Sequence, residues 1–78
     1  GLAGWQSTNE SLLGATAQAI TVAGFPGFVV NGAMQTIAVG MGATAVQGLL
    51  ITINVSSADA PKNTAAISGL LEMAASAL

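Results

Sequence analysis

Few side chains in this chain are of a type that does chemistry. The 78 residues include no His, Cys, Arg or Tyr, which removes the usual metal ligands and most general bases. A nucleophilic Ser–Lys pair would need Lys62, which lies in a polar stretch with nothing nearby in the sequence to activate it. The glycines do not follow the spacing of a phosphate-binding loop. The sequence therefore predicts no enzymatic activity, no metal site and no cofactor.

Glu72 is the acidic residue to weigh for a function. An acid within an apolar helix can carry protons across a membrane. Ser68 and Ser76 lie four residues before and after it, so the three side chains would share one stripe of a helix. We interpret Glu72 as a partly solvated acid on this polar stripe.

Three features of the sequence bear on processing. The chain begins with Gly1 rather than Met, which favours a mature product left after cleavage. Asn9 and Asn54 each open an Asn-x-Ser tripeptide, the acceptor for N-glycosylation. The two asparagines are thus candidate glycosylation sites, and they hint at an extracellular face.

The composition is typical of a chain whose surface is covered by lipid or by other protein subunits. Charged residues make up 5% of the chain, the mean hydropathy is +0.74 and the net charge is −2, whereas an ordinary globular protein is about 25% charged. One Lys and no Arg argue against direct binding to DNA or RNA. Ala and Gly together account for 26 residues, 16 and 10 respectively, and favour close packing between helices. We expect contact with lipid, with further copies of the chain, or with both.

An uncharged stretch of thirty residues, from Phe28 to Ser57, organises the prediction of the fold. Small residues recur at every fourth position in it, which on a helix makes a shallow groove where another backbone can approach. We predict one long helix over residues 28–56, about 43 Å long and able to cross a bilayer. The residues expected to pack subunits together are Gly32, Thr36, Gly40, Thr44, Gly48 and Thr52.

The remaining segments are predicted to be helical as well. Ser7 and Glu10 have the spacing of a capping box, which indicates a helix over residues 8–24, and Pro26 then interrupts the chain. Residues 57–61 form a polar turn, and residues 62–78 a C-terminal helix. Two strand alternatives stay open: two short strands between Ile20 and Val30 around a Phe-Pro-Gly turn, and a β-branched strand over residues 49–55. We predict an all-α helical hairpin, a single subunit of residues 1–78, that assembles into a helical filament.

This layout resembles the pilins of conjugative type IV secretion systems, including archaeal DNA-import pilins. The resemblance implies a subunit stored in the cell membrane after signal cleavage and then drawn into a hollow extracellular filament. In such a filament, Ser57, Asp59 and Lys62 would face the lumen. The implied partners are many copies of the chain, a bound membrane lipid, and single-stranded DNA passing through the lumen without sequence-specific contact.

Other functions fit a small apolar subunit too. One alternative is the coat protein of a filamentous or membrane-bearing virus. A third is the rotor proteolipid of ATP synthases, which Gly40-Met41-Gly42, the polar turn and Glu72 resemble, although Glu72 lies six residues from the chain end. A membrane-active peptide is disfavoured because positive charge is lacking.

Overall fold

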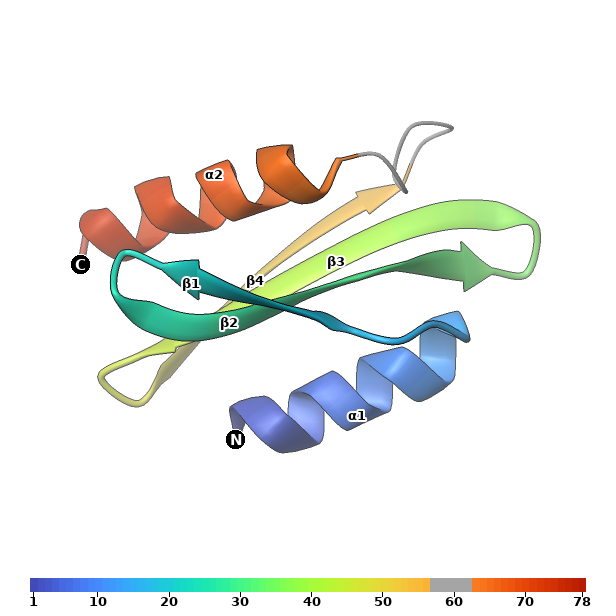
Figure 1. Ribbon diagram of the computed structural model, residues 1–78, viewed down its shortest axis with the longest axis horizontal. Helices are drawn as coiled ribbons and strands as arrows, with labels where there is room; N and C mark the ends of the chain where they lie inside the picture. Colours follow the sequence, from blue (N-terminus) through green and yellow to red (C-terminus); the bar gives the residue numbers. More distant parts are fainter. Residues whose placement is uncertain (57–62) are drawn as a thin grey trace.

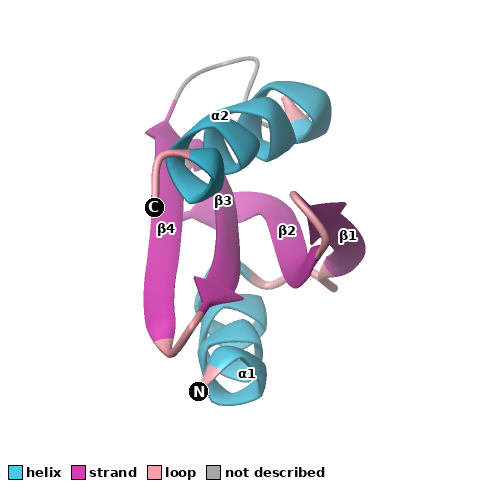
Figure 2. Cartoon of the chain, turned by 90° about the vertical axis from the view of Figure 1, so that its left-hand side faces the viewer, coloured by secondary structure: helices cyan, strands magenta, loops and turns pink. Residues whose placement is uncertain are grey.

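The structure is a sheet covered by one helix on each face. The computed structural model describes residues 1–56 and 63–78. Four antiparallel strands follow one another across the sheet in the order β1–β2–β3–β4, with α1 on one face and α2 on the other (Figures 1 and 2). In chain order, the described elements are α1 (Leu2–Leu13), β1 (Gln18–Val22), β2 (Phe25–Met34), β3 (Ile37–Val46), β4 (Leu49–Ser56) and α2 (Thr64–Ser76).

The prediction of an all-α fold is therefore wrong, and the long helix over residues 28–56 does not exist. That stretch instead forms most of β2, all of β3 and all of β4. The helix expected over residues 8–24 is also misplaced, because α1 begins at Leu2 and residues 18–22 are strand β1. Glu10 does not cap a helix start; its Oε2 accepts a hydrogen bond of 2.7 Å from the backbone N–H of Ala17 and ties the end of α1 to the chain entering β1. The C-terminal helix is present as α2.

Two-residue loops join the four strands and set the register. The first loop residues, Ala23, Gln35 and Gln47, all have positive φ, and they recur every twelve residues. Gly24 and Gly48 continue two of these loops with φ of +84° and +82°, as a type I′ turn requires. Such turns match the right-handed twist of paired strands, so the chain folds back tightly at each one. The twelve-residue spacing of the loops is three times the four-residue spacing of the small residues. Small residues at every fourth position are therefore compatible with hairpins as well as with a helix.

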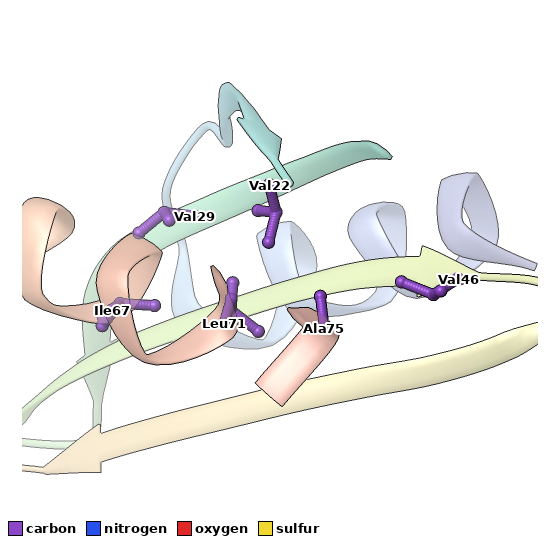
Figure 3. Packing of buried hydrophobic residues seen from close by; sticks show 6 residues of the cluster. All are labelled: Val22, Val29, Val46, Ile67, Leu71 and Ala75. Carbon is purple, nitrogen blue, oxygen red and sulfur yellow. The ribbon is translucent and has the colours of Figure 1, made fainter. Parts of the chain in front are cut away.

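Side chains alternate between two separate cores, one on each face of the sheet. On the α1 face, the buried residues are Leu13, Phe28, Val30, Met41 and Ala43. On the α2 face, shown in Figure 3, the buried residues are Val22, Val29, Val46, Ile67, Leu71 and Ala75. Both faces are buried in the middle of β2, at residues 28–30, and along most of β3, so these parts read as continuous apolar runs and not as an alternating pattern.

Glycines in the sheet allow both helices to approach closely. A Cβ atom at Gly32 would clash with the backbone of Leu13 in α1. A Cβ atom at Gly42 would clash with Ile67 and Leu71 of α2. The small residues thus do serve close packing, but of helices against a sheet and not of helix against helix.

Pro26 lies where the pairing of β2 with β3 stops. The β2–β3 ladder ends at the pair Gly27–Thr44, so Pro26, which has no backbone N–H, does not have to donate a hydrogen bond to β3. The hydroxyl of Thr44 is fully buried and donates a hydrogen bond of 2.8 Å to the carbonyl oxygen of Pro26. The Phe-Pro-Gly turn of the strand alternative is thus absent: the turn lies at Ala23, ahead of the proline.

Candidate functional site

The strand β4 forms one edge of the sheet and alternates regularly along its length. Ile51, Ile53 and Val55 are half-buried and pack against the α2-side core. Leu50, Thr52, Asn54 and Ser56 are exposed and project to the α1 side. In the described residues, no strand pairs with the outer side of β4.

The register shows which backbone groups of β4 point outward. Residues next to a two-residue hairpin loop form a hydrogen-bonded pair, and here these are Val46 and Leu49. Such pairs alternate along an antiparallel ladder, so Ile51, Ile53 and Val55 bond to β3. The residues whose N–H and C=O groups point away from β3 are therefore Leu50, Thr52, Asn54 and Ser56.

This edge lacks the features that normally keep strand edges apart. Natural proteins protect edges with short strands, charged residues, Pro or bulges. The strand β4 is eight residues long and carries neither a charge nor a Pro, and its pairing with β3 runs without a bulge from Val39–Ser56 to Val46–Leu49. The opposite edge, β1, is only five residues long, and the same alternation leaves only Ala19 and Thr21 with outward backbone groups. The longer unprotected edge is thus β4.

An apolar groove of about 320 Å³ lies on the α1 face between α1 and the sheet, and it reaches the strand β4 at Asn54. It exists because α1 packs on β2 and β3 and makes little contact with β4, whose side chains on this face are exposed. Asn9 is its most buried polar side chain, and its Nδ2 donates a hydrogen bond of 2.8 Å to the carbonyl oxygen of Trp5. The residues lining the groove are Trp5, Asn9, Leu12, Leu13, Met34, Val39 and Asn54.

On the other face, α2 presents an apolar flank toward β4. The side chain of Asn31 in β2 donates a hydrogen bond of 2.7 Å to Thr64 Oγ1, so Thr64 and the adjacent Ser68 lie on the β2 side of the helix. At 100° per residue, Leu70 falls on the opposite flank, toward β4. Leu70 is 46% exposed and Met73, further round the helix, is 72% exposed. Apolar side chains thus stand exposed beside the β4 edge on both faces.

The structure scatters the residues that were expected to pack subunits. Gly32 lies in β2, Gly40 and Thr44 in β3, and Thr52 in β4, whereas Thr36 and Gly48 lie in hairpin loops. They form no common stripe, so the predicted helical packing surface is wrong. Of this set, Thr52 alone is exposed on the outer strand.

The other candidate residues have separate outcomes. Ser57, Asp59 and Lys62, expected in a lumen-facing turn, lie outside the described residues. Asn9 is 6% exposed inside the α1 packing, where a glycan has no room, whereas Asn54 is exposed and remains a candidate for glycosylation. Glu72 is exposed on α2, and the described residues contain no cluster of acidic, His or Cys side chains able to hold a metal ion.

Comparison with known proteins does not assign the chain to a family. No family model, no curated protein and no solved structure matched the chain. The features that can indicate a function are therefore the β4 edge, the groove and the α2 flank.

Part of this site had a visible sequence signal. After Leu49 and Leu50, the β-branched run at residues 49–55 alternates apolar and polar side chains from Ile51 to Ser56, which is the period of a half-buried strand. The paired loop dipeptides Gln35-Thr36 and Gln47-Gly48, twelve residues apart, bracket β3 and support hairpins. What the sequence did not indicate is that β4 lies at an edge and not in the middle of the sheet.

Proposed function

We propose that this protein is a structural subunit without enzymatic activity, which assembles with copies of itself by continuing its sheet across β4. The observation that carries the proposal is the outer side of β4, an eight-residue edge without charge, Pro or bulge. Unpaired N–H and C=O groups along such an edge are a template for another strand.

The exposed apolar side chains support the same function. Trp5 and Leu12 stand beside the edge on the α1 face, and Leu70 stands on the α2 face. A standard interface buries about 800 Å² on each partner, which is about a fifth of the 4407 Å² surface of this chain. An interface of that size would include the flanking side chains as well as the paired strands.

The pilin function loses the support that suggested it. The resemblance rested on a long helix rich in small residues, and that segment forms strands. Within residues 1–56 and 63–78, neither helix has the length and apolar character needed to cross a bilayer. We therefore carry forward from the sequence only the expectation of assembly with identical copies, and we propose no role in DNA transfer, lipid binding or ion transport.

The test is to place a charge on the proposed edge. Thr52→Lys keeps the exposed position polar but puts a cation where a paired strand would lie. We expect the wild-type chain to sediment as an oligomer and Thr52→Lys to sediment as a folded monomer, with its fold checked by circular dichroism. Thr21→Lys, the same change on the opposite edge strand, is the matched control and should assemble as the wild type does. A wild-type chain that stays monomeric at all concentrations, or a Thr52→Lys variant that assembles normally, would contradict the proposal.

A further inference from the structure

We infer that the unit of assembly is a closed two-fold dimer, in which β4 pairs antiparallel with β4 of a second copy and Ile53 lies on the axis. The inference rests on the proposed self-assembly and makes it specific. Its central elements are the outward backbone groups of Leu50, Thr52, Asn54 and Ser56.

The alternation of β4 restricts the register. Shifting a strand by one residue moves every side chain to the other face. Ile51, Ile53 and Val55 face α2, so odd-numbered residues must oppose odd-numbered residues of the second copy. Centring the pair on Ile53 satisfies this condition, because it opposes Ile53 to its own counterpart and Ile51 to Val55.

The same register uses all of the outward backbone groups. With Ile53 on the axis, Leu50 opposes Ser56 and Thr52 opposes Asn54, and both become hydrogen-bonded pairs. A register centred on Thr52 would leave Ser56 opposite the hairpin loop at Gly48. Centring on Ile53 thus satisfies every outward group of the strand.

A second copy fits this edge because a two-fold axis brings identical residues together. Like charges opposite each other destabilise a strand pair, and β4 carries no charge. On the α2 face, the opposed side chains are all β-branched, and on the α1 face Thr52 meets the amide of Asn54. Pairs of these kinds stabilise adjacent strands relative to Ala pairs.

Helix α2 would complete the dimer on its face of the sheet. It lies mainly over β3 and β4, so its counterpart in the second copy would lie about two strand spacings away, roughly 10 Å. Helices pack at 8–10 Å. The exposed flank that would meet the second helix is the one with Leu70.

The rival arrangement is an open one, in which β4 of one copy pairs with β1 of the next. Such a head-to-tail contact does not close and produces a filament. It would match an edge with four outward residues to one with only Ala19 and Thr21. The isologous pair leaves no outward group of β4 unpaired, and it leaves the two short β1 edges at the ends of an eight-stranded sheet.

Single cysteines distinguish the two arrangements, because the chain contains no natural Cys. Residues opposed in a non-hydrogen-bonded antiparallel pair have Cα atoms about 4.5 Å apart, within the disulfide range of about 4.4–6.8 Å. Under copper-catalysed oxidation of the full chain, we expect Ile53→Cys to form a disulfide dimer nearly completely. Thr52→Cys alone should stay uncrosslinked, since its counterpart lies two residues along the opposing strand.

A mixed experiment covers the case in which Ile53→Cys fails to fold. Equal amounts of Thr52→Cys and a mass-tagged Asn54→Cys, both changed at exposed positions, should give the mixed disulfide. Crosslinking of Thr52→Cys to itself would overturn the register centred on Ile53. A third variant, Thr21→Cys, tests the pairing of β4 with β1. If Thr52→Cys crosslinks only to Thr21→Cys while the chain still assembles, the two-fold dimer is overturned but the proposed self-assembly stands. A monomeric wild-type chain without any of these disulfides would overturn both.

Discussion

At the scale of single residues, the glycines separate two roles that look alike in the sequence. Gly42 lies in β3 directly beneath α2, where there is no room for a side chain. Gly69 lies on the exposed surface of α2, and a Cβ atom there would meet no neighbouring atom within 4 Å. Their effects on stability should therefore have opposite signs.

We expect Gly42→Ala to destabilise the fold by about 1–3 kcal/mol, the usual cost of overpacking a core. The added methyl group would clash with Ile67 and Leu71 and push α2 off the sheet. Gly69→Ala should stabilise the fold by about 0.5–1 kcal/mol, because Gly is unfavourable within a helix. Urea unfolding followed by circular dichroism measures both changes. Equal midpoints for the two variants would show that α2 does not rest on Gly42.

At the scale of elements, each hairpin depends on a loop whose first residue has positive φ. Gln47 has φ of +52° without being Gly, Asn or Asp, the residues that tolerate this conformation. The β3–β4 hairpin thus forms although its first loop residue, Gln47, is unfavourable at positive φ. Its second loop residue, Gly48, adopts positive φ without strain.

We therefore expect Gln47→Asn to stabilise the protein by about 1 kcal/mol, since Asn-Gly is the favoured type I′ pair. The readout is a higher urea midpoint with an unchanged slope. Gln18→Asn, in strand β1, is the control, and it should give no gain because Asn is disfavoured in strands. A lower midpoint for Gln47→Asn would argue against the type I′ loop.

The elements also show how much of this fold the sequence could reveal. The apolar face of residues 62–78 predicted a helix, and this helix is present as α2, with Ile67, Leu71 and Ala75 buried. Residues 28–46 could not be assigned from periodicity, because both faces are buried in the middle of β2 and along most of β3, and an apolar run fits a helix or a central strand equally well. The decisive signals were the loop dipeptides, and Gln35-Thr36 and Gln47-Gly48 are weaker turn signals than Asn-Gly.

The candidate site was harder to predict than the strands themselves. The alternation from Ile51 to Ser56 indicates a strand with one exposed face. Whether its backbone groups are free depends on the order of strands in the sheet, which is a property of the whole chain and not of one segment. The groove likewise exists only because α1 covers β2 and β3 and stops short of β4.

At the scale of the whole molecule, the charged side chains of the described residues have almost no part in the proposed assembly. Glu10 binds the backbone of Ala17 in its own chain, and Glu72 lies on α2 near Ser68 and Ser76, away from the flank with Leu70. Within the described residues, the proposed interface contains strand pairing, uncharged polar side chains such as Thr52 and Asn54, and apolar side chains. Its strength should therefore be insensitive to ionic screening.

We expect the dissociation constant of the assembly to change less than about threefold between 50 and 500 mM NaCl, concentrations chosen to span roughly 14 to 4 Å in Debye length. Sedimentation velocity over a dilution series measures it. An interface held by ion pairs would weaken strongly over this range, so a tenfold or larger loss would point to a contact other than the β4 edge.

The order of the elements along the chain has a consequence for how the molecule is made. Every strand pairs with its neighbour in sequence through a two-residue loop, so the sheet can form early from local contacts. Helix α2 follows all four strands, and until it docks, Ile51, Ile53 and Val55 have no cover. During synthesis on the ribosome, the growing chain would therefore expose one apolar face and one open edge together, and the docking of α2 would compete in time with premature pairing between nascent chains.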